Sequence, residues 1–243
     1  MQKEVIGNAT LYCGDALEIL PQLEAGFNGL ITDPPYSSGG TFASGRQSAP
    51  DSKYGIVGHL NFSGDNRDAR SWAHWSMVWL SAAAQRVDSG GYVMLFTDWR
   101  QLPATTDVIQ GGGVVWRGIV PWDKTLSSRA PHKGYFRHQC EYVVWGSIGP
   151  LPKCQHGGPW PGLISQRVIP AEKLHMTAKP VPLMDALIKP LGDIPRVLDP
   201  FMGSASTAIP VLRQGGFFTG IEMNPQVFDI ACERIYKEVS EGL

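Results

Sequence analysis

The sequence predicts an α/β protein with a mostly parallel sheet. Short apolar segments alternate with segments of helical periodicity along most of the chain. Residues 91–97 form a near-continuous apolar run, which is typical of a central parallel strand covered on both faces. Residues 196–239 follow the order strand, turn, helix, strand, helix. One domain accounts for all 243 residues, because α/β folds commonly exceed the usual single-domain length.

The first elements lead to a turn that carries an acid. Residues 9–13 are predicted as a strand, residues 16–23 as a short helix that Pro21 bends, and residues 29–32 as a second strand. Residues 37–70 have no helical or strand period and are rich in Ser, Gly, Asn and Asp. Such a long loop is unusual in a compact domain, so we expect it to close over a substrate, with a tolerated surface insertion as the alternative.

The middle of the chain is predicted to extend the sheet. A helix at 71–87, ended by residues 88–91, carries Trp72, Trp75 and Trp79 at helical spacing, and we expect these rings to pack in the core. The other elements expected here are a helix at 101–110 and strands at 91–97, 114–121 and 141–146. Residues 147–175 are irregular and too poor in apolar periodicity to build a core of their own.

The C-terminal portion is predicted to alternate helices and strands. The expected elements are helices at 179–189, 206–213 and 226–239 and strands at 196–198 and 217–221. Asn224 and Pro225 stand at the cap and the first position of the last helix, where these residue types are preferred.

Composition excludes several classes of protein. No apolar run approaches the roughly 18 residues that span a bilayer, and the first residues do not resemble a signal peptide, so we expect a cytoplasmic location. The four cysteines form no C-x-x-C pair, which argues against a disulfide framework. Cys154 and His156 are close in sequence but would need two further ligands to hold zinc, so we predict no metal.

Residues 30–36 are the first candidate site. A buried strand is predicted to end in Asp33-Pro34-Pro35-Tyr36, where the prolines fix the directions of the Asp33 carboxylate and the Pro34 carbonyl. Neither proline has an N–H, so the turn offers acceptors and few donors. It suits a flat substrate that bears an NH2 group, with the Tyr36 ring stacked on its face. An ordinary surface turn is the alternative.

Residues 199–222 form the second candidate site. Small residues, Gly203 and Ser204, follow Asp199 in a turn that lets the backbone approach a ligand, and Glu222 ends the next strand at the spacing of an acid that binds ribose hydroxyls. The G-x-G-x-x-G pyrophosphate cradle is absent, which argues against a dinucleotide oxidoreductase. A nucleoside without phosphates is the expected ligand, with the Asp199 carboxylate near its cationic or amino group.

These motifs together resemble those of amino-group DNA methyltransferases. Asp33-Pro34-Pro35-Tyr36 is similar to the catalytic motif of that family, and Asp199-Pro200-Phe201-x-Gly203-Ser204 to its S-adenosylmethionine motif. His175-x-x-x-Lys179-Pro180 lies between them, and Phe136-Arg137-His138 through Trp145-Gly146 resembles the late strand of the family. The catalytic motif precedes the cofactor motif, as in the circularly permuted β class.

The resemblance implies a fold and an activity. The fold would be the Rossmann-like methyltransferase fold, with a mostly parallel seven-stranded sheet and one antiparallel strand. The activity would be transfer of a methyl group from S-adenosylmethionine to the N6 amine of adenine in double-stranded DNA, with base flipping. It would be a single catalytic domain, with its long loop at about 37–70 and a small target-recognition region at about 147–175. A restriction–modification setting is typical of the family, and the oligomeric state is left open, with a homodimer as one option.

The resemblance also implies roles for individual residues. Asp33, Pro34, Pro35 and Tyr36 would act on the base. The residues expected around the cofactor are Asp15, Lys179, Pro180, Asp199, Phe201, Gly203, Ser204 and Glu222. Asp15 would meet the adenine amino group of the cofactor; a solvent-facing turn acid is the alternative there.

A basic stretch is the candidate DNA contact. The formal net charge of the chain is −1, but basic residues outweigh acidic ones between Arg100 and Arg137. Cations interleaved with rings suit a strand of phosphates with exposed bases. The residues expected to contact DNA are Lys124, Arg129, Lys133 and Arg137.

Departures from the family pattern and alternatives remain. Ala205 stands where the family usually has a second glycine, so we expect a slightly tighter cofactor turn. Cytosine-N4 transfer uses the same geometry, but Asp33 favours adenine because the cytosine-N4 members more often have Ser there. A catalytically inactive nucleic-acid-binding module is the alternative from another class. Methylation at carbon needs a nucleophilic Cys beside Pro, whereas Cys140 lies between Gln139 and Glu141 and is expected to be buried.

Overall fold

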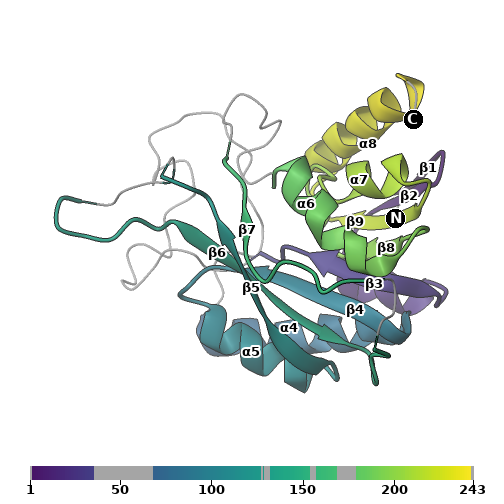
Figure 1. Cartoon of the computed structure of the whole chain (residues 1–243). Coiled ribbons are helices and arrows are strands. Elements are labelled where there is room, and N and C mark those ends of the chain that lie inside the picture. Colours follow the sequence, from purple (N-terminus) through teal and green to yellow (C-terminus); the bar gives the residue numbers. More distant parts are fainter. Residues whose placement is uncertain are drawn as a thin grey trace.

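The protein folds around one nine-stranded sheet (Figure 1). The computed structural model describes residues 2–35, 68–126, 128, 132–153, 157–168 and 179–241. Its strands are β1 (Gln2–Ile6), β2 (Ala9–Cys13), β3 (Phe27–Thr32), β4 (Val87–Thr97), β5 (Val115–Asp123), β6 (Cys140–Ser147), β7 (Ile164–Ser165), β8 (Arg196–Asp199) and β9 (Phe217–Glu222). Their order in the sheet is β1-β2-β9-β8-β3-β4-β6-β5-β7.

Parallel pairing dominates the sheet. β2, β9, β8, β3 and β4 are parallel neighbours, whereas β6 runs antiparallel between β4 and β5. β1 adds an antiparallel edge strand beside β2, and β7 adds two residues parallel to β5. The sheet therefore exceeds the seven strands expected. The seven strands between β1 and β7 contain the one antiparallel strand that the sequence led us to expect.

Helices cover both faces of the sheet. The helices are α1 (Ala16–Ile19), α4 (Ala69–Ala84), α5 (Leu102–Gly111), α6 (Val181–Ile188), α7 (Ala208–Arg213) and α8 (Pro225–Ser240), with 3-10 turns η1 (Leu20–Gln22) and η3 (Lys189–Leu191). Figure 1 shows α6, α7 and α8 on one side of the sheet and α4 and α5 on the other.

Two cores result from the alternation of side chains along the strands. Leu30 points into the core beneath α1, α4 and α5, whereas its neighbour Ile31 points into the core beneath α6, α7 and α8. Burying a side chain of this size stabilises the fold by about 1.5–3 kcal/mol. Both faces of β3 are thus anchored, and the turn that follows it starts from a fixed position.

Some predicted boundaries were wrong. The helix predicted at 71–87 ends at Ala84, and residues 88–91 lie in β4 rather than ending a helix. Strand β4 begins at Val87 because Val87 pairs with Phe27 at the start of β3, with a register shift before the pair of Gly29 and Tyr92. Cys140, expected to be buried, is half-buried at the start of β6. Trp72 and Trp79 lie in the core as predicted, while Trp75 is only partly buried.

Candidate active site

A row of acidic residues lies at the carboxyl ends of the parallel strands. Because parallel strands end on the same side of a sheet, residues that follow them come together there. Each of the five parallel neighbours ends at, or within two residues of, a carboxylate. These acids, in sheet order, are Asp15, Glu222, Asp199, Asp33 and Asp98. The two candidate sites of the sequence, 166 residues apart, are therefore neighbours, because β8 pairs with β3.

Asp33 has one engaged oxygen and one unpartnered oxygen. Lys179 donates a hydrogen bond to Asp33 Oδ2. Asp33 Oδ1 is buried and has no hydrogen-bond partner among the described residues. Buried polar atoms in folded proteins nearly always have a hydrogen-bond partner, so this unpartnered acceptor calls for one. A ligand that donates an N–H could supply it.

The turn after Asp33 is held by a tryptophan. The indole Nε1 of Trp72, from α4, donates to the carbonyl oxygen of Pro35 at 2.8 Å. The Trp72 side chain is 1% exposed, so the hydrogen bond is shielded from water. Pro34 is buried and Pro35 half-buried. Sequence reasoning assigned Trp72 to the core alone. Its helical spacing carried no sign of the second role.

Charges beside Asp33 oppose its desolvation. Burial raises the pKa of Asp33 above its ordinary value, and the Lys179 ammonium acts in the opposite direction. Burial alone would lower the pKa of Lys179, but Asp33 and Glu141 raise it above its ordinary value. Glu141, from β6, lies 3.7 Å from Lys179 Nζ and was missed by sequence reasoning. Lys179 therefore contacts Asp33, and its contact with the cofactor stays a prediction.

Asp199 is engaged entirely within the protein. Its Oδ1 accepts hydrogen bonds from Thr32 Oγ1 at 2.6 Å and from Phe201 N at 3.2 Å, and its Oδ2 accepts from Thr207 Oγ1 at 2.8 Å. The residue is 2% exposed. Burial raises the pKa of Asp199 to about 7, against the effect of these hydrogen bonds. These hydrogen bonds make Asp199 a link between β8, β3 and the start of α7, and its contact with a ligand's cationic group stays a prediction.

The turn after Asp199 exposes backbone to open space. Gly203 has φ +52°, and a Cβ there would meet no atom within 4 Å. Ala205 has φ +58°, so it keeps a left-handed conformation that favours glycine. Arg234, from α8, donates to Ser204 O at 2.9 Å and to Ser206 Oγ at 3.0 Å. These two hydrogen bonds from α8 hold the turn in place. Arg234 was not predicted as a site residue.

Glu222 and Asp15 end the two strands beside this turn. Glu222 Oε2 accepts from Gly203 N at 3.2 Å, and its Oε1 accepts from Asn224 N at 2.8 Å. Burial raises the pKa of Glu222 above its ordinary value. Asp15 is exposed and caps α1 by accepting from Leu17 N at 2.8 Å. The Gly14 N–H donates to Glu222 O at 3.0 Å, which brings Asp15 beside Glu222.

Phe201 and Pro180 are the two remaining residues predicted to contact the cofactor. The Phe201 ring packs against Trp79 with centroids 4.9 Å apart and against Trp75 at 5.4 Å. Pro180 is the N-cap residue of α6 and follows Lys179 directly. These contacts fix Phe201 to α4, the helix that also holds Pro35.

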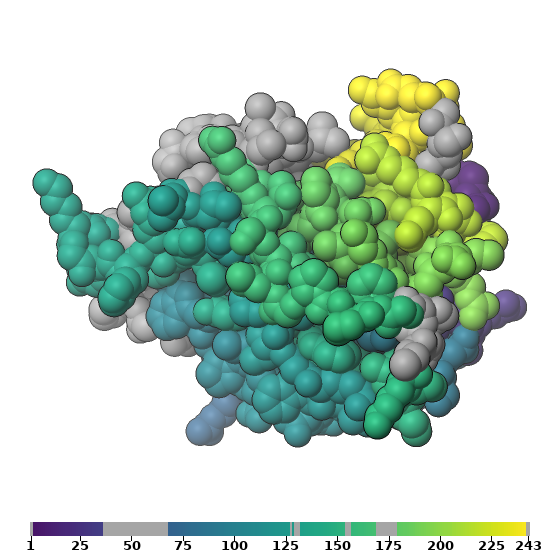
Figure 2. Space-filling model, viewed as in Figure 1, coloured from purple at the N-terminus to yellow at the C-terminus, as the bar shows by residue number. Residues whose placement is uncertain are grey.

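Three of the predicted DNA contacts, Lys124, Lys133 and Arg137, lie on the β5–β6 hairpin, which projects from the body of the molecule (Figures 1 and 2). Lys133 and Arg137 are exposed, and Arg137 donates to Ser128 O at 2.9 Å. Phe136, between them, is 98% exposed. Lys124 differs from them, because its side chain is only 17% exposed and lies 3.0 Å from Glu141 Oε1.

Several sequence predictions lie outside the described residues. These are the roles of Tyr36 and Arg129, the Cys154 and His156 pair, His175, and nearly all of the loop expected at 37–70. Within the described ranges, no group of three or more His, Cys, Asp or Glu side chains could hold a metal ion. Nor does any helix there have the length and apolar character that crossing a bilayer requires.

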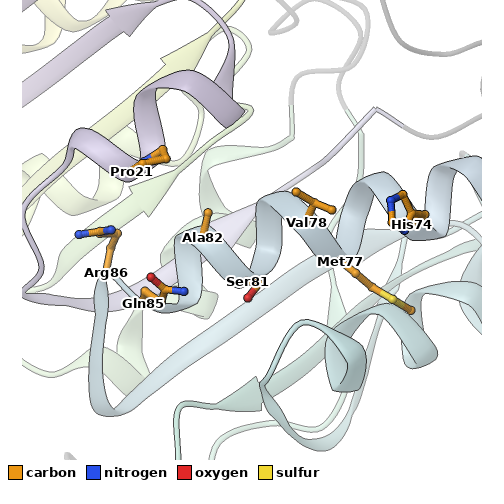
Figure 3. A pocket seen from close by; sticks show the side chains of 8 residues that line it. All are labelled: Pro21, His74, Met77, Val78, Ser81, Ala82, Gln85 and Arg86. Atoms are coloured by element: carbon orange, nitrogen blue, oxygen red, sulfur yellow. The ribbon is translucent and has the colours of Figure 1, made fainter.

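A surface hollow lies away from these acids. Figure 3 shows Pro21 of η1 opposite side chains of α4 and of the two residues that follow it. The eight lining residues are Pro21, His74, Met77, Val78, Ser81, Ala82, Gln85 and Arg86. None of them is a predicted site residue. The strand ends, with their acceptors, are chemically the stronger site.

Known proteins resemble this chain over most of its length. Residues 153–233 match a family model described as DNA methylase. The putative methylase YubD of Escherichia coli (strain K12) is 27% identical over 210 residues, which cover 85% of this chain and 80% of that protein. The type II methyltransferase M2.LlaDCHI of Lactococcus lactis subsp. cremoris is 23% identical over 256 residues, which cover 97% and 92%.

A solved structure shares the fold. The crystal structure of a complex of M1.HpyAVI with SAM superposes with a TM-score of 0.67 at 20% sequence identity, covering 93% of this chain and 98% of that one. The predicted Rossmann-like α/β fold of the methyltransferase type is confirmed.

Proposed function

Since the chain is a relative of the amino-group (N6/N4) DNA methyltransferases, as its motifs predicted, we propose that it methylates the exocyclic N6 amine of adenine in DNA. S-adenosylmethionine supplies the methyl group, which it carries on a positively charged sulfur. The observation that supports this proposal most directly is the unpartnered Asp33 Oδ1 at the end of β3.

Asp33 and Pro34 activate the amine. The lone pair of an exocyclic amine is delocalised into the ring, which makes the nitrogen a poor nucleophile. Asp33 Oδ1 and the Pro34 carbonyl each accept one N–H, which favours the tetrahedral geometry that frees the lone pair. Lys179 holds the other oxygen of Asp33, so the carboxylate is oriented before the substrate arrives. Tyr36 stacks on the flipped base, with Pro35 and Trp72 holding the turn that carries it.

The residues around the second turn suit the cofactor. The open space beside Gly203 leaves room for a ligand against the backbone, and the half-buried Glu222 offers carboxylate oxygens to ribose hydroxyls. Asp15, exposed beside Glu222, takes the adenine amino group. Ser204, Phe201, Lys179, Pro180 and Asp199 complete the cofactor side, and Asp199 also fixes the turn.

Double-stranded DNA is the partner in this reaction. Lys133 and Arg137 on the projecting hairpin, together with Arg129, contact phosphates. The chain acts as a single catalytic domain, in which residues 37–70 close over the base and residues 147–175 contribute to target recognition. Asp33 tilts the choice of base towards adenine, because the cytosine-N4 members more often have Ser at this position.

Nucleoside analysis tests the proposal. Unmethylated double-stranded DNA is incubated with the protein and isotopically labelled S-adenosylmethionine, then digested to nucleosides and analysed by mass spectrometry. The expected product is labelled N6-methyladenine. The Asp33→Ala variant, purified in the same way, shows that the activity does not come from a contaminating host enzyme. Labelled N4-methylcytosine would overturn the choice of base, and no transfer by the wild type would overturn the activity.

A further inference from the structure

Four side chains of alternating charge form a continuous line that ends at Asp33. Lys179 contacts Asp33 and lies 3.7 Å from Glu141 Oε2, while Glu141 Oε1 lies 3.0 Å from Lys124 Nζ. The four residues come from separate places: the end of β3, the start of α6, β6 and the end of β5. We name them the charge line. Its middle pair, Lys179 and Glu141, is 10% and 20% exposed.

Burial makes each link of the charge line matter. Removing one partner of a buried ion pair leaves an uncompensated charge, which is strongly unfavourable. Lys179 also lies over the Phe96 ring, 5.1 Å from its centroid, so it is confined between this ring and two carboxylates. A Lys179 ammonium shared by two carboxylates neutralises neither of them completely. Asp33, Lys179 and Glu141 together carry a charge of −1.

We propose that Glu141 is a positioning residue for methyl transfer: it shares Lys179 with Asp33 and so keeps the catalytic carboxylate oriented toward the amine, while its own negative charge offsets the positive charge of Lys179 there. The proposal rests on the proposed function. It also assigns Lys124 to the outer end of the charge line rather than to a phosphate, because its side chain is largely buried against Glu141.

The charge balance of the reaction supports this role. Methyl transfer breaks a carbon–sulfur bond and forms a carbon–nitrogen bond, so a positive charge leaves sulfur and appears on the amine nitrogen until a proton departs. An acceptor beside that nitrogen stabilises the developing positive charge more strongly when the acceptor group carries a net negative charge. A Lys179 paired with Asp33 alone would cancel that charge. The negative charge of Glu141 offsets part of the positive charge that Lys179 places beside Asp33.

The charged groups around Asp33 are contributed by several elements. Lys179 precedes α6, Glu141 belongs to β6, and Asp199 ends β8. Lys124, directly after β5, forms an ion pair with Glu141 and does not itself contact Asp33 among the described contacts. Asp98, after β4, is paired with Arg100 at 3.0 Å. Glu141 raises the pKa of Asp33, and Lys179 lowers it. The two neighbours therefore act on Asp33 with opposite signs.

Opposite shifts in a pH–rate profile provide the test. The rate of methyl transfer in a single turnover, with DNA and S-adenosylmethionine saturating, is measured from pH 5 to pH 9. Glu141→Gln should reduce the rate roughly 10- to 100-fold at neutral pH, as loss of a positioning partner does elsewhere. Its acidic limb should move to lower pH, because an influence that raises the Asp33 pKa is removed. Lys179→Met should move the limb to higher pH.

Controls separate this role from a structural one. Asp88 and Arg196 form an ion pair near the starts of β4 and β8, at the other end of these strands from Asp33. Asp88→Asn removes the carboxylate of that pair and should leave both the rate and the acidic limb of the pH–rate profile unchanged. Thermal unfolding and calorimetric titration with S-adenosylmethionine establish that each variant is folded and binds cofactor. Glu141→Asp keeps the charge and should retain the wild-type limb even where the rate falls.

The outcomes divide clearly. Limbs displaced in opposite directions support the proposal. If the wild type is active but Glu141→Gln keeps both rate and limb, or if both variants lose rate with unmoved limbs, Glu141 does not act on Asp33. Inactivity of the wild type on DNA would instead overturn the proposed function, and this outcome is read from the wild type alone.

Discussion

Two turns of similar sequence, at the ends of neighbouring strands, use their acids in different ways. An Asp-Pro pair stands at each strand end: Asp33-Pro34 directly follows β3, and Asp199, the last residue of β8, precedes Pro200. Asp199, at the end of β8, has hydrogen bonds from two threonines and one backbone amide. Asp33, after β3, has one oxygen on Lys179 and one oxygen unpartnered among the described residues.

The different hydrogen bonding of Asp33 and Asp199 shows how one strand end keeps an acceptor open for a ligand while its neighbour does not. Thr32 donates to Asp199, so the acid of the cofactor turn holds the last residue of β3 in place. The next residue along that strand is Asp33. One carboxylate is thus used to fix backbone, and the other is left with an open acceptor. An Asp-Pro pair alone does not distinguish these uses, because the neighbours that decide between them are distant in sequence.

The largest effect is expected from removing the open acceptor. Asp33→Ala should lower the turnover of methyl transfer by roughly 10²- to 10³-fold, since an oriented group that stabilises the transition state is lost. The dissociation constant for S-adenosylmethionine, measured by calorimetry, should stay within about threefold, a difference below 1 kcal/mol. Unchanged turnover would remove Asp33 from its proposed role.

The second prediction concerns the satisfied acid. The pKa of Asp199 is raised from 3.8 to about 7, so the folded state binds its proton more tightly than the unfolded state. The stability contributed by this group is present at low pH and is lost as the pH rises from about 4 to about 7. Relative to Asp199→Asn, the unfolding free energy of the wild type should therefore fall across that range by at most about 1.4 kcal/mol per pH unit.

Urea unfolding at a series of pH values measures that difference. Thr207→Val sharpens it, because the Thr207 hydroxyl lowers the pKa of Asp199 and its loss should move the pH range upwards. Parallel curves for the wild type and Asp199→Asn would show that this carboxyl does not titrate differently in the folded protein.

The smallest effect is expected from Trp72, the tryptophan that donates a hydrogen bond to the turn after Asp33. Trp72→Phe removes the donor to Pro35 and should cost about 1 kcal/mol of unfolding free energy from the hydrogen bond, with a several-fold fall in turnover. Trp79→Phe is the matched control, since Trp79 lies in the same helix, is fully buried, and has no partner for Nε1 among the described residues. Equal losses of turnover in the two variants would contradict a specific role for Trp72.

Much of the fold could be predicted from local patterns. The apolar run of β4, the Asn224 cap of α8 and the acids at the ends of β3 and β9 are all visible in the sequence. β1 was missed because Gln2, Lys3 and Glu4 hide its pattern; an edge strand needs few apolar residues.

The site was less predictable because its contacts are long-range. Lys179 meets Asp33 across 146 residues, and Thr32 meets Asp199 across 167. Glu141 and Arg234 carried no motif, since each acts through a neighbour rather than on a ligand. The motif pattern predicted which acids belong to the candidate site, but it did not predict that Asp199 is hydrogen-bonded within the protein while Asp33 keeps an open acceptor.

The strand order has a consequence for how the chain folds during synthesis. β2 and β3 are close in sequence, but β9 and β8 lie between them in the finished sheet. A nascent chain that ends before residue 196 therefore has β2 and β3 with facing edges bare, and exposed strand edges promote association with other chains. The sheet closes only when the C-terminal unit inserts between them, and the same event joins Thr32 to Asp199. A chain released before residue 196 would lack β8 and β9, and with them the hydrogen bond that joins Thr32 to Asp199.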